Sequence, residues 1–208
     1  MSEVKERPIL FSAPMVSAIL EGRKSQTRRV LKGSTEFKEP YNPAYLEAHR
    51  GAPGWKTICP YGVPGDRLWV KETSIIAPKY FNDGKDCNAR DEEGVPRIVQ
   101  YLATNPNRDA ANDYHLKVSP SIFMFRWASR ITLEITDVRV QRLQEIAPAD
   151  AKCEGDHERS GMPEFYSRGE LCHVDWFHYL WDSINAKRGF GWDTNPWVWA
   201  LSFKRVDA

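Results

Sequence analysis

One segment of the chain alternates strictly between apolar and polar residues, and this pattern constrains the fold more than any other feature. Apolar residues occupy every second position of residues 131–136. These apolar residues are Ile131, Leu133 and Ile135. A period of two is typical of a β-strand with one buried face. Val138 and Val140 continue the strand on the opposite face, so we predict a β-bulge near Asp137.

Other segments predict short strands and helices in mixed order. We expect strands at 65–72, at 97–103 and in the C-terminal PWVWALSFKRV segment, where four apolar residues share a face. These four residues are Trp197, Trp199, Leu201 and Phe203. Helices are expected after Ser12, around Pro148 and at about 170–187. Short strands with interleaved helices predict an α+β fold, in the form of a small β-barrel with helices packed outside it.

Long connecting segments separate these elements. Residues 33–64 contain many Gly, Pro and aromatic residues, and residues 74–124 are irregular apart from the strand expected there. The GRKSQTRR segment, which begins at Gly22, has the composition of a polar turn. The length of 208 residues suits one elaborated domain or at most two small ones. We predict a single domain over 1–208 with insertions at about 33–64 and 74–124.

The composition excludes several classes of protein. The chain has 29 Lys and Arg against 28 Asp and Glu, a net charge of +1, so binding through a uniformly positive surface is excluded. The N-terminal segment is not a signal peptide, and no apolar run is long enough to span a membrane. The motifs of P-loop hydrolases, dinucleotide enzymes, zincins and α/β-hydrolases are absent from the sequence.

The cysteines indicate a cytoplasmic protein with reduced thiols. The chain has 4 cysteines, and none forms a C-x-x-C pair. Cys153 with His157, or Cys172 with His173, could in principle bind a metal, but ordinary core or surface roles explain these residues better. We therefore predict no metal and no other cofactor.

The densest positive charge lies in the GRKSQTRR segment, which holds Arg23, Lys24, Arg28 and Arg29 without an acid. Two interpretations stay open: a solvated turn near a helix C-terminus, or a site for a phosphate or nucleotide. Lys24 and Thr27 are three residues apart, so an amine base could meet a hydroxyl nucleophile. Such a base must be neutral, which requires a pKa lowered from ~10.4 to about 7–8. Neighbouring arginines and partial burial favour this change.

Glu154 is the candidate third member of this group. It stands in the last turn of the short helix expected around Pro148, where a carboxylate opposes the helix dipole. One interpretation is an exposed helix-end glutamate, and the other is a functional residue placed against local preference. Because a carboxylate raises the pKa of a neighbouring lysine, Glu154 would orient Lys24 or act as an acid.

Two further segments carry candidate binding residues. Glu72, at the end of WVKE, could pair with the basic segment or recognise the amino group of a base. The FRWASR segment combines Arg126, Trp127 and Arg130, a mixture that suits stacking on a nucleobase. The alternative for FRWASR is a core tryptophan flanked by surface arginines.

Four segments, taken in order, carry a family resemblance. They are LEGRKSQTRRV, GDRLWVKET, RWASRITLEITDVRVQRL and GWDTNPWVWALSF. Together they resemble ASCH-domain proteins, in the larger form often encoded by phages and prophages. The resemblance implies a PUA-like β-barrel with helices around it. It also implies a cleft lined by a G-x-K-x-x-T turn, here Gly22, Lys24 and Thr27.

The resemblance also implies a function. Smaller bacterial members of the ASCH group are amidohydrolases that act on N4-acetylcytidine through a Lys, a Thr and a Glu. Carried over residue by residue, these are Lys24, Thr27 and Glu154. Other ASCH proteins are proposed RNA binders, and some resemble ribonucleases.

The first hypothesis is therefore an amidohydrolase that removes an acyl group from an N4-acylated cytidine-type nucleoside. Thr27 attacks the carbonyl, Lys24 takes its proton, and Glu154 holds the lysine or protonates the leaving nitrogen. The predicted substrate-binding residues are Arg23, Arg28, Arg29, Glu72, Tyr101, Arg126, Trp127 and Arg130. Of these, Trp127 or Tyr101 would stack on the base.

Two alternatives are kept open. In the first, the protein is a non-catalytic RNA-binding module whose groove combines the basic segment with FRWASR. In the second, less favoured one, it is a ribonuclease. The expected partner is a modified nucleoside or RNA, with no membrane and no obligatory metal, and the oligomeric state stays open.

Overall fold

The structure is a computed structural model, and it describes residues 3–31, 59–76, 98–106, 117–155 and 173–206. The chain divides into two compact units. Unit 1 comprises Met1–Lys5, Ala18–Arg67 and Glu134–Arg205, and unit 2 comprises Glu6–Ser17, Leu68–Leu133 and Val206–Ala208. The single domain predicted from the sequence stays a prediction.

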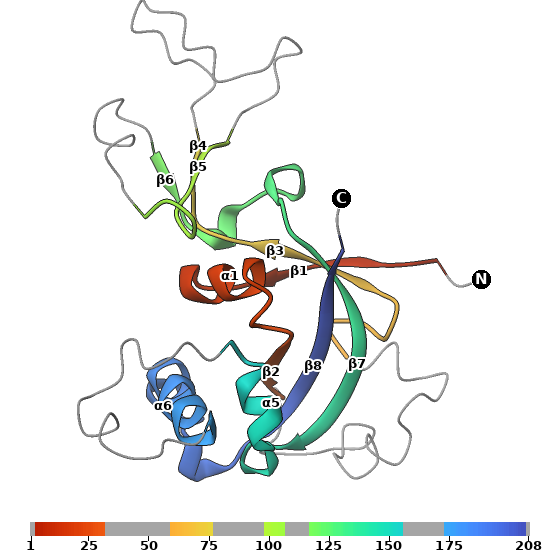
Figure 1. Cartoon of the computed structure of the whole chain (residues 1–208), viewed down its shortest axis with the longest axis vertical. Helices are drawn as coiled ribbons and strands as arrows, with labels where there is room; N and C mark the ends of the chain where they lie inside the picture. Colours follow the sequence, from red (N-terminus) through yellow and green to blue (C-terminus); the bar gives the residue numbers. More distant parts are fainter. Residues whose placement is uncertain (1–2, 32–58, 77–97, 107–116, 156–172, 207–208) are drawn as a thin grey trace, which may run out of the picture. The chain divides into compact units, whose positions relative to one another are not determined.

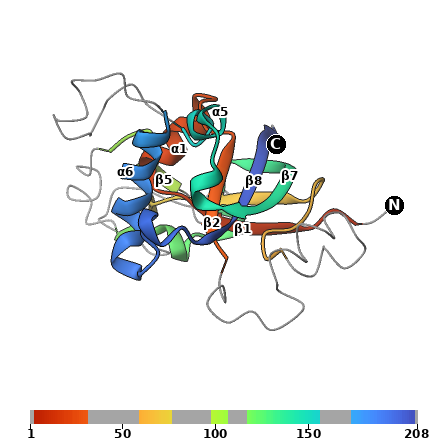
Figure 2. The same cartoon turned by 90° about the horizontal axis from the view of Figure 1, so that it is seen from below.

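A five-stranded sheet has the strand order β1-β3-β7-β8-β2. Its strands are β1 (Glu6–Leu10), β2 (Gln26–Val30), β3 (Arg67–Lys71), β7 (Thr132–Arg142) and β8 (Trp197–Val206). The long strands β7 and β8 lie side by side in both Figure 1 and Figure 2. β2 pairs antiparallel with β8, from Gln26 opposite Ser202 to Val30 opposite Val198.

Strand β7 confirms the alternating pattern of the sequence. Leu133 and Ile135 are buried, Thr136 is exposed, and burial then resumes at Val138 and Val140. The buried face therefore changes between Ile135 and Val138, as the apolar positions predicted. The strands predicted at 65–72 and in the C-terminal segment are confirmed as β3 and β8.

A second sheet, in unit 2, has three strands in the order β5-β4-β6 (Figure 1). They are β4 (Ser74–Ile76), β5 (Ile98–Tyr101) and β6 (Lys117–Ser119). Ile75 and Leu102 form its buried core, with Val118 packed against them. β5 confirms the strand predicted at 97–103, but the prediction that the rest of 74–124 is irregular was wrong for β4 and β6, because these two strands pair antiparallel with each other.

The helices form close to the predicted positions. They are α1 (Ala13–Leu20), α5 (Pro148–Lys152) and α6 (His173–Asn185). The Ser12 carbonyl accepts the Val16 N–H at the start of α1, and Gly22, with φ 76°, follows its end. The residues expected in α6 before His173, and most of the segment 33–64, lie outside the described residues. This mixture of helices and sheets confirms the α+β class.

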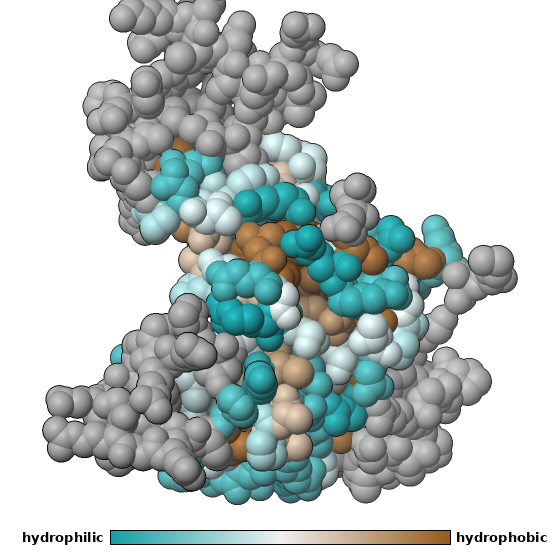
Figure 3. Space-filling view, in the orientation of Figure 1, coloured by the Kyte–Doolittle hydropathy of each residue, from teal (hydrophilic) through white to brown (hydrophobic). Residues whose placement is uncertain are grey.

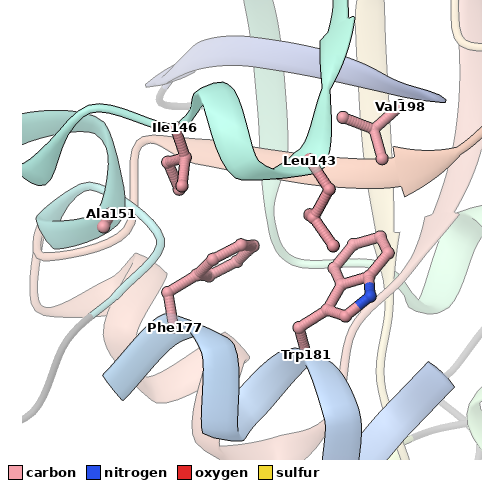
Figure 4. Packing of buried hydrophobic residues seen from close by; sticks show 6 residues of the cluster. All are labelled: Leu143, Ile146, Ala151, Phe177, Trp181 and Val198. Atoms are coloured by element: carbon pink, nitrogen blue, oxygen red, sulfur yellow. The ribbon is translucent and has the colours of Figure 1, made fainter. Parts of the chain in front are cut away.

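One buried cluster of unit 1 lies between α6, the segment that joins β7 to α5, and β8 (Figure 4). Phe177 and Trp181 of α6 point toward Leu143 and Ile146, and the Trp181 indole N–H donates to the Phe190 carbonyl at 2.7 Å. The remaining buried members are Ala151 and Val198, and the partly buried residues packed against the cluster include Val30. This cluster holds α5 and β2, the two elements that carry the candidate site, in one packed body.

The prediction that GRKSQTRR is only a polar turn was wrong. The turn ends at Ser25, and the chain continues as strand β2 from Gln26. The polar sequence of β2 hid the strand, because the faces of β2 contact charged side chains and its hydrogen bonds come from the distant β8.

The described surface mixes residue types. On the face shown in Figure 3, hydrophilic and hydrophobic residues are interspersed over the described residues. No helix in the described ranges is long enough and apolar enough to cross a membrane.

Candidate functional site

Two of the predicted catalytic residues, Lys24 and Glu154, meet in unit 1. Lys24 Nζ donates to Glu154 Oε2 at 2.8 Å and also to the Glu154 carbonyl oxygen at 2.8 Å. The side chain of Lys24 is 0% exposed and that of Glu154 is 3% exposed. A buried ion pair with this geometry satisfies both groups, while either one alone would be a strongly destabilised charge.

The backbone brings these two residues together. The N–H groups of Ser25 and Gln26 both donate to the Cys153 carbonyl at 2.9 Å, which pairs the turn before β2 with the end of α5. Lys24 and Glu154 form an antiparallel β-bridge at this point. Gly155, with φ 100°, follows directly. A Cβ at Gly155 would lie 3.1 Å from Lys24 Cβ, so a larger residue would crowd the lysine.

Arg28 extends the pair into a network. Its Nη1 donates to Glu154 Oε1 at 2.9 Å and its Nη2 to Asp150 Oδ2 at 3.1 Å, with the Arg28 side chain 0% exposed. The Arg28 guanidinium also lies 5.7 Å from the ring centroid of Phe177. Arg28 was predicted to bind substrate, but its charge is directed at two carboxylates of the protein.

Asp150 is a member of the network that the sequence analysis missed. It accepts hydrogen bonds from Gln26 at 2.8 Å and from Arg139 at 3.0 Å, in addition to that from Arg28. Asp150 lies in α5, but Glu154 lies beyond the end of α5 at Lys152, in the bridge with Lys24, so the prediction that Glu154 stands in the last turn of this helix was wrong. The spacing of four residues between Asp150 and Glu154 was visible in the sequence, but the sequence did not show that Arg28 joins the two carboxylates.

Burial and the Glu154 carboxylate act in opposite directions on the pKa of Lys24. Burial lowers the pKa of the Lys24 amine, the Glu154 carboxylate raises it, and Arg29 and Arg28 lower it. The net direction is downward from the ordinary lysine value, which favours the neutral amine. Partial burial raises the pKa of Asp150, but hydrogen bonds from Gln26 and Arg139 bring it below the ordinary value.

Among the described residues, Thr27 makes none of the hydrogen bonds that join this network. Successive residues of a strand point to opposite faces, so Thr27 and Arg29 share the face of β2 opposite Arg28. Thr27 is 3% exposed, and within the described residues its hydroxyl forms no hydrogen bond with Lys24 or Glu154. The structure therefore brings together two of the three predicted catalytic residues, and does not join the third to them.

Arg29 has a different environment from Arg28. Burial lowers the pKa of the Arg29 guanidinium, and the neighbouring Tyr61 and Glu154 raise it. Burial raises the pKa of the Tyr61 phenol, which Arg29 opposes. Arg23 is on the surface, where it forms an ion pair with Glu21 and donates from Nη1 to the Gly155 carbonyl at 3.0 Å.

Three other predicted binding residues, Glu72, Tyr101 and Arg130, form a second cluster in unit 2. Arg130 holds Glu72 through two hydrogen bonds, Nε to Oε1 at 2.8 Å and Nη2 to Oε2 at 3.0 Å. The Arg130 guanidinium lies 4.0 Å from the Tyr101 ring centroid, and Tyr101 donates its hydroxyl to the Ala128 carbonyl. Partial burial raises the pKa of Tyr101, which Arg130 opposes. The three side chains therefore contact one another, and Arg130 and Glu72 form a bidentate ion pair within the protein.

The remaining predicted residues, Arg126 and Trp127, lie in an exposed turn of unit 2. We define the aromatic turn as Ile122, Phe123, Phe125 and Trp127, whose exposed fractions are 59%, 66%, 62% and 46%. The rings of Phe125 and Trp127 are 12° from parallel, with centroids 6.2 Å apart. Arg126 forms a surface ion pair with Glu6 at 2.9 Å. The interpretation of Trp127 as a core residue was wrong, because nearly half of its surface is exposed.

In the described ranges, no cluster of His, Cys, Asp and Glu could hold a metal ion. Cys59 and Cys153 form no disulfide within the described residues, and His157 and Cys172 lie outside them.

Comparisons with known proteins identify only distant similarities. No family model matches the sequence, and no curated protein matches it. A DUF984 protein from Enterococcus faecalis V583 has a TM-score of 0.42 at 10% identity, covering 100% of this chain and 84% of the other. An ASCH domain from Lactobacillus crispatus JV V101 has a TM-score of 0.36 at 14% identity, covering 97% of this chain and 79% of the other. Both similarities are too weak to assign this chain to a family.

Proposed function

We propose that the protein is an amidohydrolase that removes an acyl group from the exocyclic nitrogen of a cytidine-type nucleoside. The observation that carries the proposal is the buried pair of Lys24 and Glu154, whose amine and carboxylate lie 2.8 Å apart. Burial lowers the pKa of Lys24, which favours its role as a general base, while Glu154 opposes this change but fixes the position of the amine. We also keep three expectations from the sequence as proposals. They are a PUA-like β-barrel fold, a relationship to the larger phage-type ASCH proteins, and a single domain.

The reaction follows from the proposed roles. Thr27 Oγ1 attacks the amide carbonyl carbon, and its proton passes to the neutral amine of Lys24. The C–N bond then breaks, and the exocyclic nitrogen takes that proton and leaves as the free amino group. Water then attacks the acyl carbon of the ester on Thr27, and the bond between that carbon and Thr27 Oγ1 breaks. One proton of the water restores the Thr27 hydroxyl, and the other is released as the acid ionises to a carboxylate. Glu154 orients the Lys24 amine throughout, and Arg23 and Arg29 hold the sugar or a phosphate.

This mechanism requires a local rearrangement that opens the buried side chains of Lys24 and Thr27 to the substrate. Thr27 Oγ1 and Lys24 Nζ must come within hydrogen-bond distance when the substrate binds. Catalytic hydrogen bonds often tighten only in complexes, so the proposal does not require a hydrogen bond between Thr27 and Lys24 in the free protein.

Release of cytidine from N4-acetylcytidine tests the proposal. We expect turnover by the wild type, with kcat/KM rising as the pH passes the Lys24 pKa, which lies below the ordinary 10.5. Replacing Lys24 with alanine removes the base and should abolish turnover. Equal and negligible release by wild type and Lys24→Ala would contradict the catalytic role.

The aromatic turn favours a second candidate, an RNA-binding module. Exposed, nearly parallel rings beside Arg126 suit unpaired bases, which stack on aromatic side chains. No comparable observation favours a ribonuclease.

Fluorescence anisotropy with a labelled single-stranded RNA at low salt tests this candidate. Stacking contributes about 1–3 kcal/mol per base, so Trp127→Ala should weaken binding roughly 5- to 150-fold. Tyr179→Ala removes an aromatic residue of α6 that is 37% exposed, and it serves as the matched control. The candidate fails if RNA does not bind at low salt, or if both variants bind it equally.

A further inference from the structure

The carboxylate of Glu154 is divided between two cations. Its Oε2 accepts from Lys24 and its Oε1 accepts from Arg28, at 2.8 Å and 2.9 Å. Both basic side chains are 0% exposed, so water does not screen either contact. The strength of the ion pair between Glu154 and Lys24 therefore depends on how much of the Glu154 charge Arg28 compensates.

Arg28 is in turn divided between two carboxylates. Its Nη1 reaches Glu154 and its Nη2 reaches Asp150 at 3.1 Å. Asp150 is fixed by two further donors, Gln26 and Arg139. A continuous network of alternating charges is thus formed by Lys24, Glu154, Arg28, Asp150 and Arg139.

The numbers of positive and negative groups in this network affect Lys24. Three basic side chains, those of Lys24, Arg28 and Arg139, share the two carboxylates of Glu154 and Asp150. Arginine stays protonated in proteins, so among the three cations of this network only Lys24 can release a proton. Arg29, on the other face of β2, adds a further positive charge near Lys24.

We propose that Arg28 and Asp150 are positioning residues that set the protonation state of Lys24 by dividing the charge of Glu154. Arg28 compensates part of the negative charge of Glu154, which weakens the attraction of Glu154 for protonated Lys24 and so favours the neutral amine. Asp150 compensates part of the positive charge of Arg28 and so opposes that effect. The relevance to catalysis rests on the proposed function, but the charge coupling itself concerns only the free protein.

This coupling makes two variants act in opposite directions. Arg28→Met leaves Glu154 to Lys24 alone, so the Lys24 pKa should rise, by about one to three units for loss of a neighbouring charge. Asp150→Asn leaves Arg28 to Glu154, so the Lys24 pKa should fall. A variant that merely disturbed the local structure would expose Lys24 and move its pKa toward the ordinary value in both cases.

The pKa is measured by NMR of the full chain with ¹³C-labelled lysine, following the Lys24 Cε signal with pH. Lys24→Arg assigns the signal. Arg28→Lys keeps the positive charge and should stay closest to the wild type. Lys204→Met removes a lysine that is 59% exposed and paired with Glu134 at 3.0 Å, and it should leave Lys24 unchanged.

Opposite shifts in Arg28→Met and Asp150→Asn support the proposal. Shifts in the same direction, or a Lys24 pKa that neither variant moves, overturn it. If Arg28→Met does not fold, Asp150→Asn decides, because Asp150 is only partly buried: a fall supports the coupling, and a rise or no change refutes it. A wild type that hydrolyses no acylcytidine would remove the proposed function without changing these shifts, so the two failures are distinguishable.

Discussion

Replacing Glu154 with alanine is expected to lower the free energy of unfolding by about 3–5 kcal/mol, the range for breaking one partner out of a buried ion pair. Glu154 accepts hydrogen bonds from Lys24 and Arg28, and both side chains are 0% exposed. Without the carboxylate, Lys24 would lose its proton or draw in water, and the Nη1 of Arg28 would lose its acceptor.

Urea denaturation measures this loss. Glu21→Ala is the matched control, since Glu21 also pairs with an arginine, Arg23, but is 53% exposed. An exposed pair contributes about 0–1 kcal/mol, so the control should unfold nearly as the wild type does. Combining Lys24→Met with Glu154→Leu should recover part of the loss, because no lysine charge stays buried. Equal destabilisation by Glu154→Ala and Glu21→Ala would show that the buried pair is not a stabilising contact.

The regular strands of the fold were predictable from local pattern. The alternation around Leu133 and the aromatic C-terminal segment both read as half-buried strands, and both are strands. Strand β2 was not predictable in this way, because its residues are mostly polar. The pairing of Gln26 with Ser202 joins segments far apart in the chain, and such contacts leave no trace in local composition.

The candidate site shows the same limit. Neither periodicity nor spacing connects Lys24 with Glu154, and only the family resemblance suggested that they meet. The sequence also contained no information on which charges pair with which. Glu72 was predicted to recognise a base, yet Arg130 occupies both of its oxygens. Arg28 and Arg29 read as equivalent cations, but strand alternation turns them to opposite faces.

Replacing Thr27 with valine is expected to reduce acylcytidine hydrolysis on the order of 10⁴-fold or more, the scale of losing one member of a catalytic triad. Valine keeps the branched shape of a side chain that is 3% exposed, and removes only the hydroxyl that is proposed to attack. Thr27→Ser keeps a hydroxyl and should retain measurable turnover. Ser25→Ala, which deletes a hydroxyl from the same segment, is the matched control and should leave kcat near the wild-type value.

The comparison of these variants distinguishes two ways in which Lys24 and Glu154 could act. If Thr27→Val is inactive while urea denaturation shows unchanged stability, the hydroxyl is the nucleophile, and substrate binding must bring Thr27 into hydrogen-bond contact with Lys24. If Thr27→Val hydrolyses the substrate as fast as the wild type while Lys24→Ala does not, the covalent step is wrong. The buried pair would then activate a water molecule, since a neutral amine held by a carboxylate can take a proton from water as it does from a hydroxyl.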